Sequence, residues 1–330
     1  MTCQYELYHD TIHEVLVRRE NMIEPVISVC CLAYNHEPYI RQALDGILMQ
    51  KTEFPFEIII HDDASTDHTA AIIREYAEKY PDIIKPIYQK ENQYSKDPRV
   101  LKNFLYPKAK GKYIALLECD DYWTDPNKLQ KQVCYMETHP ECSGTFHASN
   151  WVTDGKIIRN DRHFQEECNI TPQQVIVGGG EYCATASLCF RSQYALDYPS
   201  FRQMDEICDY SLEILLPLRG IFHYFPDIMC HYRFGRSGSW TASMKNDQSK
   251  RYHSLQKTVA WLKQLDKDTA YQYSTEIYYK IGKENCVLYL NGVIPFSELT
   301  ECLSHMKWGK LKFLMLKKCY ERYMKTGFRG

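Results

Sequence analysis

The sequence lacks the features that would place it at once among membrane, secreted or zinc-binding proteins. No run of it approaches the roughly 18 apolar residues that a membrane-spanning helix needs. Met1 to Asp10 lacks the apolar core of a secretory signal. Fourteen cysteines are present, but no CxxC pair and no Cys/His zinc spacing occurs. We therefore expect reduced, mostly buried thiols in a cytoplasmic protein.

A strong net charge and two common nucleotide-binding motifs are also missing. The formal net charge is −2, which argues against a protein that binds nucleic acid or other polyanions. No GxGxxG follows the first predicted strand, and no Walker-type lysine loop occurs. The sequence therefore favours neither a dinucleotide-binding protein nor a P-loop protein. At 330 residues the chain is long enough for one large domain, or for one domain with an appendage.

What the sequence does contain is an alternation of apolar strands and amphipathic helices. Strands are predicted at 26–33, 56–60, 83–88 and 112–117, with helical segments in the intervals between them. The strands are almost continuously apolar and the connections are short. This pattern predicts an α/β domain with a mostly parallel sheet covered by helices on both faces.

Polar residues follow three of these strands, at the point where each strand ends. They are Tyr34-Asn35, Asp62-Asp63 and the run Glu118-Cys119-Asp120-Asp121. Because ligands of open α/β sheets bind beyond the carboxyl ends of the strands, we expect the three groups to gather at one edge. Three carboxylates within four residues repel one another unless a cation neutralises them. A hard divalent ion, held by carboxylate and phosphate oxygens, would do so. A solvated acidic turn is the alternative.

Several of these residues have a structural alternative to ligand binding. Asp62, Asp63 and Asp67 could cap the helix that follows them, and we assign capping chiefly to Asp67. Asn35 fits a helix N-cap as well as it fits a ligand contact. Trp123 fits packing better than sugar stacking.

The rest of the chain reads as further strands followed by helices. A strand is predicted at 142–152 with a hairpin turn at Asp154-Gly155. A helix at 210–218 follows Asp209, and a strand at 221–234 leads into a Gly/Ser loop. From about residue 243 the pattern is helical throughout. We therefore predict an N-terminal arm (1–24), an α/β domain (25–242) and a helical C-terminal region (243–330).

Three of these segments together resemble family 2 glycosyltransferases of the GT-A fold. They are Pro25–Asn35, Ile58–Asp67 with its Asp-Asp-Ala-Ser-Thr-Asp, and Leu117–Trp123 followed by Asp125-Pro126. The last segment is similar to members that assemble bacterial capsular or surface polysaccharides. The resemblance covers residues 25–240 and implies a Rossmann-like, mostly parallel sheet flanked by helices, here with a helical C-terminal extension.

The resemblance implies roles for named positions. Asp120 aligns with the family's DxD motif and would be the main ligand of Mg²⁺ or Mn²⁺, with Glu118 as a weaker metal ligand. The donor-binding candidates are Ala33, Tyr34, Asn35, Glu37, Asp62, Asp63, Glu118, Cys119, Arg233, Arg236 and Trp240. Similar sequences often carry a histidine after the pair that is Tyr232-Arg233 here. Its absence leaves phosphate neutralisation to Arg233 or Arg236, with His231 as the other candidate.

Asp209 matches the family's catalytic base, with Asp205 and Glu206 as nearby competitors. The resemblance implies an inverting, metal-dependent transfer of a sugar from a nucleotide-diphosphate donor, UDP by default, to a glycan or lipid-linked acceptor. Two alternatives stay open. One is a non-catalytic carbohydrate-binding or scaffold protein with a degenerate site. The other is a sugar nucleotidyltransferase, although the segment 34–37 is not the Gly-rich basic loop that those enzymes usually carry.

The segment 305–330 is basic, with aromatic and aliphatic residues interleaved among its lysines and arginines. A basic amphipathic helix of this kind can lie on an anionic membrane surface. It can equally pack on the rest of the protein and leave its basic face in water. The sequence thus predicts either a wholly cytoplasmic protein or one held peripherally on the inner face of the membrane.

Overall fold

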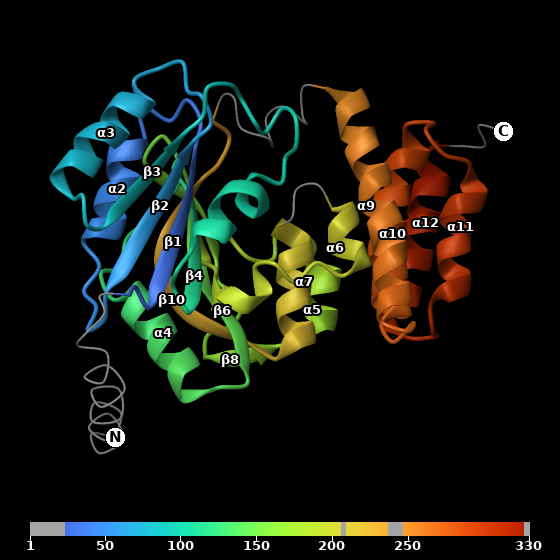
Figure 1. The fold of residues 1–330 in the computed structure, drawn as a ribbon. Helices are drawn as coiled ribbons and strands as arrows, with labels where there is room; N and C mark the ends of the chain where they lie inside the picture. The colour runs from blue at the N-terminus through green and yellow to red at the C-terminus, as the bar shows by residue number, and fades with distance from the viewer. Residues whose placement is uncertain (1–23, 206–208, 237–246, 327–330) are drawn as a thin grey trace. The chain divides into compact units, whose positions relative to one another are not determined.

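The computed structural model describes residues 24–205, 209–236 and 247–326 (Figure 1). Its contacts divide the chain into two compact units. The first comprises the chain up to Ile170 together with Cys183–Asp197 and Leu215–Phe234. The second comprises Thr171–Tyr182, Tyr198–Ile214 and the chain from Gly235 onward. The units are assembled from separate segments, so the boundary placed near residue 242 stays a prediction. Nearly all of the predicted N-terminal arm lies outside the described residues.

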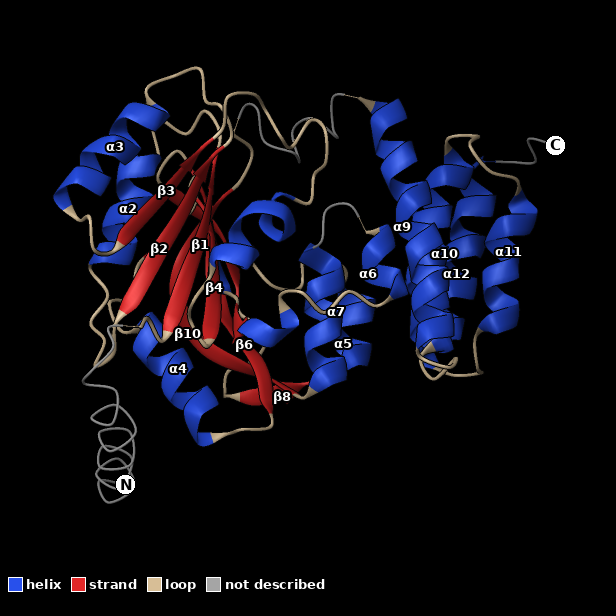
Figure 2. Ribbon diagram, viewed as in Figure 1, coloured by secondary structure: helices blue, strands red, loops and turns tan. Residues whose placement is uncertain are grey.

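A mixed ten-stranded sheet forms the centre of the first unit (Figure 2). Its order is β3-β2-β1-β4-β9-β6-β10-β5, with β7 paired to β6 and β8 paired to β10. The strands are β1 (Ile27–Ala33), β2 (Phe56–Asp62), β3 (Ile84–Tyr88), β4 (Tyr113–Glu118), β5 (Tyr122–Trp123), β6 (Cys142–Thr153), β7 (Lys156–Asp161), β8 (Cys168–Ile170), β9 (Cys189–Arg191) and β10 (Ile221–Arg233). Strands β1 to β4 pair in parallel with one another, as predicted, and β9 pairs antiparallel with β4.

The helices cover the sheet of the first unit and make up most of the second unit. They are α2 (Ile40–Leu48), α3 (Thr69–Lys79), α4 (Lys128–Thr138), α5 (Pro172–Gly178), α6 (Ser200–Met204), α7 (Asp209–Arg219), α9 (Gln248–Asp268), α10 (Ser274–Leu290), α11 (Phe296–His305) and α12 (Lys310–Thr326). The helical segment predicted between the third and fourth strands is a short π-helix, Leu101–Leu105. The helical pattern predicted after residue 243 is confirmed for the described residues. None of the described helices has both the length and the apolar character needed to cross a bilayer.

The core of the first unit lies between the parallel strands and the helices α2 to α4. Side chains alternate across a strand, so Val29 and Cys31 of β1 point to the same face. They are buried in one cluster with Leu44 of α2 and Ile73 of α3. The opposite face is covered in part by the π-helix, because the rings of His61 and Phe104 lie 5.2 Å apart. This burial on both faces explains why the strands read as continuous apolar runs. No disulfide joins the cysteines that the structure describes, and most of them are buried.

Strand β10 matches the strand predicted at 221–234 to within one residue, but its partners in the sheet were not predicted. It runs parallel to β6, and its last residues also pair antiparallel with the two-residue strand β5. In that pairing Cys230 lies opposite Trp123, and His231 lies opposite Tyr122. The end of β10 is therefore held beside the turn that follows β4.

Candidate functional site

The carboxyl ends of β1, β2 and β4 lie side by side at one edge of the sheet. In the strand register Ala33 is opposite Asp62, and Leu32 is opposite Glu118. The N–H of Cys119 donates to the carbonyl of Leu32 at 2.8 Å, and the N–H of Asp63 donates to that of Ala33 at 2.9 Å. The three polar segments therefore gather as the sequence predicts.

Asn35 and Glu37 join the loop after β1 to the loop after β2. Asn35 has a left-handed backbone with φ of 52°, and its side-chain oxygen accepts from the N–H of Thr66 at 2.8 Å. Both carboxylate oxygens of Glu37 face His68, one of them accepting its backbone N–H at 3.1 Å. The hydrogen bonds from His68 lower the pKa of Glu37. The alternative of Asn35 as a helix N-cap is wrong, because the N-cap of α2 is Tyr39.

The N-cap of α3 is His68, not Asp67 as predicted, but Asp67 still binds the first N–H of the helix. One of its carboxylate oxygens accepts from the N–H of Thr69 at 2.9 Å, and the other accepts from the N–H of Glu37 at 3.0 Å. Burial alone would raise the pKa of Asp67, but these hydrogen bonds outweigh it and lower the pKa.

Asp62 and Asp63 are neighbours with different surroundings. The oxygens of Asp63 accept from the backbone N–H groups of Gln93 and Tyr94, at 2.7 and 3.0 Å. Asp63 therefore orders the loop after β3. One oxygen of Asp62 has no hydrogen-bond partner among the described residues, and burial raises the pKa of this carboxyl group. Of the two, Asp62 retains the unused acceptor atom.

The acidic segment after β4 forms a tight turn in which the three carboxylates have unequal surroundings. The N–H of Asp121 donates to the carbonyl of Glu118 at 2.9 Å. Asp121 is buried, and its Oδ1 accepts from the backbone N–H of Arg233 at 2.7 Å. Within the described residues its Oδ2 has no hydrogen-bond partner. Burial, followed by the charges of Asp120 and Glu118, raises the pKa of Asp121 well above its usual range. The carboxyl group of Asp121 thus fixes the turn rather than facing water.

Arg233 ties this turn to α2 and to β5. Its guanidinium group donates to the backbone carbonyl of Asp120 and to the side chain of Gln42. The same group lies over the rings of Tyr39 and Tyr122, at 4.8 and 4.4 Å from their centroids. Burial lowers the pKa of Arg233. Arg233, which the resemblance suggested for phosphate binding, therefore also supports the acidic turn.

We expect Arg233→Lys to destabilise the first unit by about 1–3 kcal/mol. A lysine ammonium group cannot donate to Asp120 and Gln42 at the same time with the geometry of a guanidinium group, and it has no planar face to stack on the two tyrosine rings. Urea unfolding of the purified protein measures this difference. Arg41→Lys is the matched control, since Arg41 forms an exposed pair with Glu75, and it should change stability by no more than about 0.5 kcal/mol. Equal losses in the two variants would contradict the supporting role of Arg233.

His231 is held by two neutral partners. Its Nδ1 lies 2.8 Å from the hydroxyl of Tyr122, and its Nε2 lies 3.2 Å from the amide nitrogen of Asn150. Asn160 donates to the side-chain oxygen of Asn150, so the amide nitrogen of Asn150 donates to His231. Burial, and then the charge of Arg233, lower the pKa of His231. Both ring nitrogens of His231 therefore have a hydrogen-bond partner, and the imidazole is neutral because its Nε2 accepts a hydrogen bond. Arg236 lies just beyond β10, and Trp240 lies outside the described residues.

Asp209 is the first residue of α7 and belongs to the second unit. Burial, together with the negative charge of Asp205, raises its pKa to about 7. Asp205 has a backbone role, since its Oδ2 accepts from the N–H of Ser211 at 3.3 Å. Glu206, the other competitor, lies outside the described residues. A carboxyl group that titrates near neutral pH is suited to accept a proton.

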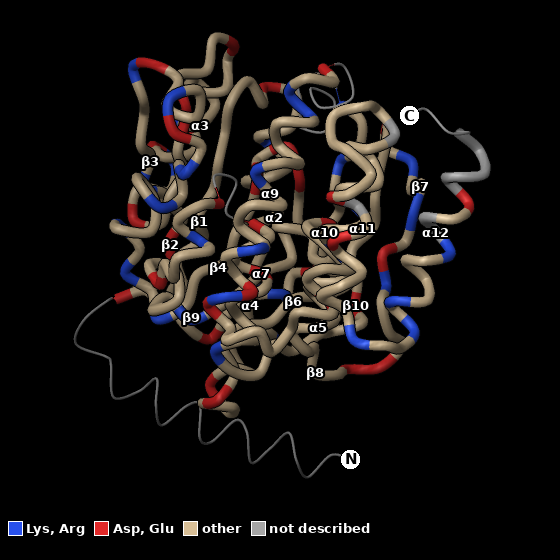
Figure 3. Tube along the Cα trace, turned by 90° about the vertical axis from the view of Figure 1, so that its right-hand side faces the viewer, with Lys and Arg blue, Asp and Glu red and all other residues tan. Residues whose placement is uncertain are grey.

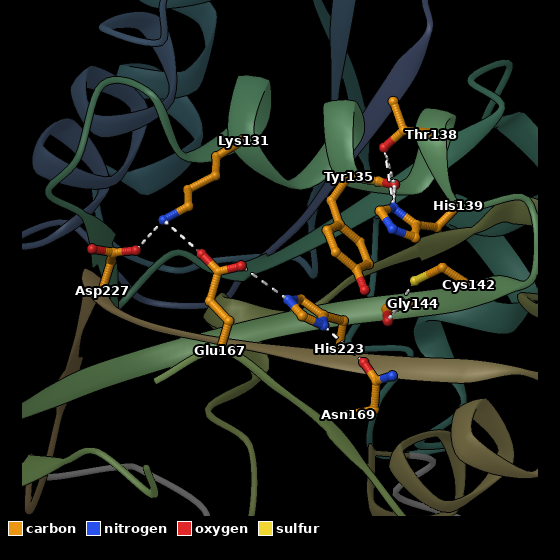
Figure 4. A network of polar contacts seen from close by, with 10 residues as sticks. All are labelled: Lys131, Tyr135, Thr138, His139, Cys142, Gly144, Glu167, Asn169, His223 and Asp227. Atoms are coloured by element: carbon orange, nitrogen blue, oxygen red, sulfur yellow. Dashed lines mark hydrogen bonds and ion pairs between the residues drawn. The ribbon is translucent and has the colours of Figure 1, made fainter. Parts of the chain in front are cut away.

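A second group of titratable residues, shown in Figure 4, joins α4 to β8 and β10. The ring of Tyr135 is stacked between His139 and His223, with centroids 4.0 and 3.8 Å away. Lys131 bridges Asp227 and Glu167. These groups are engaged with one another, so we interpret the network as structural.

The chain is similar in sequence to known proteins. A model of glycosyl transferase family 2 matches residues 28–197. An uncharacterised protein of Mycobacterium tuberculosis is 37% identical over 217 residues, which are 65% of this chain and 60% of that protein. The chain thus spans less than two thirds of the length of that relative. The putative teichuronic acid biosynthesis glycosyltransferase TuaG of Bacillus subtilis is 27% identical over 230 residues, 67% of this chain and 86% of TuaG.

Among solved structures, residues 1–349 of TarS from Staphylococcus aureus in complex with UDP-GlcNAc superimpose with a TM-score of 0.56. The identity is 16%, and the match covers 92% of this chain and 93% of the TarS chain. At this identity the likeness concerns the fold, and it confirms the GT-A architecture expected from the sequence.

Proposed function

This chain belongs to glycosyltransferase family 2, and from that premise we propose that it transfers a sugar from a nucleotide-diphosphate donor to a hydroxyl group of a glycan or lipid-linked acceptor. The observation that carries the proposal is the gathering of Ala33, Asp62 and Glu118 at one sheet edge. The UDP-GlcNAc held by TarS supports UDP as the nucleotide. The name of TuaG supports an acceptor in surface polysaccharide synthesis. The buried thiols support a cytoplasmic enzyme.

The residues of the acidic turn fit a divalent cation that also binds the donor diphosphate. The donor atoms of Asp120 and Glu118 are carboxylate oxygens, the hard ligands that such an ion prefers. No three acidic, histidine or cysteine side chains of the described residues converge on one point. Mg²⁺ typically takes one or two carboxylates and completes its shell with water and substrate phosphates. We assign Asp120 as the main ligand and Glu118 as the second. A bound ion would act as a Lewis acid toward the leaving diphosphate.

The proposed base is Asp209. It would accept the proton of the acceptor hydroxyl as that oxygen attacks the anomeric carbon, and a pKa of about 7 suits this role at neutral pH. A single base and one direct displacement invert the anomeric centre. The hydrogen bond that the backbone N–H of Arg233 donates to Asp121 would keep the acidic turn in place.

A thermal-shift screen of UDP, GDP, dTDP and their sugars, with and without Mn²⁺, tests this function. We expect stabilisation by one nucleotide together with Mn²⁺, of about 2.7 kcal/mol at a ligand concentration near 100 times the Kd. Release of free nucleotide on adding an acceptor would establish transfer. Binding without any turnover would instead favour the carbohydrate-binding alternative, and formation of a nucleotide sugar from a sugar phosphate would favour the nucleotidyltransferase.

A further inference from the structure

One face of α12 presents large apolar side chains to solvent. Phe313 and Tyr320 are each 64% exposed, and Leu314 is 38% exposed. Lys310 and Lys317 stand three or four residues from these positions, so they share the same face of the helix. Trp308, just before the helix, is 81% exposed. Isolated exposed apolar residues are common on protein surfaces, but a contiguous group is characteristic of an interaction site.

The opposite face of α12 is already packed within the second unit. Met315 is fully buried, and its Sδ lies 3.1 Å from where a Cβ on Gly282 of α10 would stand. Met306, in the connection before α12, is buried as well. The two interpretations of the C-terminal segment therefore do not exclude each other, because the helix packs by one face and leaves the other exposed. Truncation near residue 300 would remove both buried methionines, so substitutions on the exposed face are the sharper test.

The charge around these rings is mainly positive, as Figure 3 shows along α12. Lys307, Lys310 and Lys317 are exposed. Lys317 lies 3.8 Å from Glu321, but both side chains are more than half exposed, so the pair is weak. Lys312 extends over the ring of Trp308 at 4.9 Å. This combination matches the chemistry of an anionic bilayer surface. The rings can enter the boundary between headgroups and acyl chains, while the long side chains of the lysines keep their ammonium groups in water.

We propose that the aromatic–basic face, defined as Trp308, Lys310, Phe313, Leu314, Lys317 and Tyr320, binds the surface of a membrane that contains anionic lipid. The helix would lie in the plane of the interface, with its rings among the lipid headgroups and its lysines toward the phosphates. This inference extends the lipid-linked acceptor of the proposed function. Membrane binding itself requires no donor, metal or catalysis, so the two can fail separately.

Sedimentation of the full chain with phosphatidylcholine vesicles, with and without phosphatidylglycerol, tests the proposal. We expect binding to require phosphatidylglycerol and to weaken with salt. The pair Lys310→Gln and Lys317→Gln should weaken binding about 25-fold, because each lysine near an anionic surface contributes about fivefold. The pair Trp308→Ser and Phe313→Ser should weaken it at least about tenfold, since their rings would no longer be buried.

Matched controls lie in the first unit. Ile157 and Leu196 are 59% and 55% exposed, and changing both to Ser should leave vesicle binding unaltered. Lys90→Gln with Lys156→Gln matches the charge change at exposed positions. Equal binding by the α12 variants and the wild type would overturn the proposal. So would loss of a dimer in the Trp308/Phe313 variant without any effect of lipid, which would make the face an interface between copies. An unchanged nucleotide-induced thermal shift in every variant separates this result from failure of the proposed function.

Discussion

Asp209→Asn is expected to lower the rate of sugar transfer by about 100- to 10,000-fold, the usual contribution of a general base. An amide of the same shape keeps the start of α7 but cannot take up the acceptor proton. Nucleotide binding should persist, because the residue is assigned to the acceptor side of the reaction. The measurement is the turnover of donor with acceptor, beside calorimetric titration of the nucleotide. Turnover near that of the wild type would remove the assignment.

The pH dependence gives the same assignment a second readout. Asp209 must be ionised to act as a base, and its pKa is raised to about 7. The transfer rate of the wild type should therefore rise with pH up to about 7 and then level off, while the residual rate of Asp209→Asn should lack this step. The stability of the folded protein should change with pH in the opposite direction to the transfer rate. Ionising a carboxyl whose pKa is raised on folding destabilises the native state as pH rises from its unfolded value toward 7. Above that pH, the Asn variant should be the more stable protein.

Asp205→Asn is the matched control for Asp209. An asparagine can still accept the N–H of Ser211, so the start of α7 should keep its structure. The substitution removes the negative charge that helps to raise the pKa of Asp209. We expect turnover to be retained, with the rise in the pH profile moved to lower pH. Loss of turnover in Asp205→Asn alone would transfer the role of base to Asp205.

Asp120→Asn is expected to abolish the enhancement of UDP binding by Mn²⁺ and to lower turnover by at least about a thousandfold. The reason is that an ion beside the leaving diphosphate supplies several kcal/mol of transition-state stabilisation. Calorimetric titration of UDP with and without Mn²⁺ reports on the metal independently of activity. Removing the metal from the wild type with a chelator should reproduce the defect, and adding Mn²⁺ back should reverse it only in the wild type.

Asp121 supplies the comparison within the same turn. Asp121→Asn can still accept the backbone N–H of Arg233, whereas Asp121→Ala leaves that group without its partner. We therefore expect Asp121→Asn to keep the response of UDP binding to Mn²⁺. Asp121→Ala should instead lower the stability of the protein. If Asp121→Asn and Asp120→Asn lost the Mn²⁺ response equally, Asp121 would itself be a ligand and the ranking of the three acids would be wrong.

The sequence predicted the sheet edge because its signals are local. The apolar runs before Asn35, Asp62 and Glu118 define strand ends, and parallel pairing brings those ends together. The partners of the site residues could not be predicted in this way. Asp63 is bound by the backbone N–H groups of Gln93 and Tyr94, and backbone donors leave no signature in residue type.

The position of Arg233 was hidden for a related reason. The residue pattern correctly predicted that a strand ends near Tyr232 and Arg233. The strand that pairs with this end, β5, consists of only two residues and gives no periodic signal. Apart from the family resemblance, nothing in the residue pattern predicted that the end of β10 lies at the acidic turn. The same contact explains His231, whose pairing with Tyr122 follows from the register of β10 and β5. The contacts of Arg233 and of His231 both depend on pairing between segments that are distant in the sequence.

The hydrogen bond from Arg233 to Asp121 also bears on the order in which the protein is built. The two residues are separated by 112 positions, so a growing chain exposes its acidic turn long before its anchor has been synthesised. Until then, three neighbouring carboxylates repel one another with neither the N–H of Arg233 nor its guanidinium group beside them. The parallel strands β1 to β4 require shorter loop closures and can associate earlier. We expect the acidic turn to order only when β10 inserts beside β6, which makes donor-binding capacity one of the last properties that the folding chain acquires.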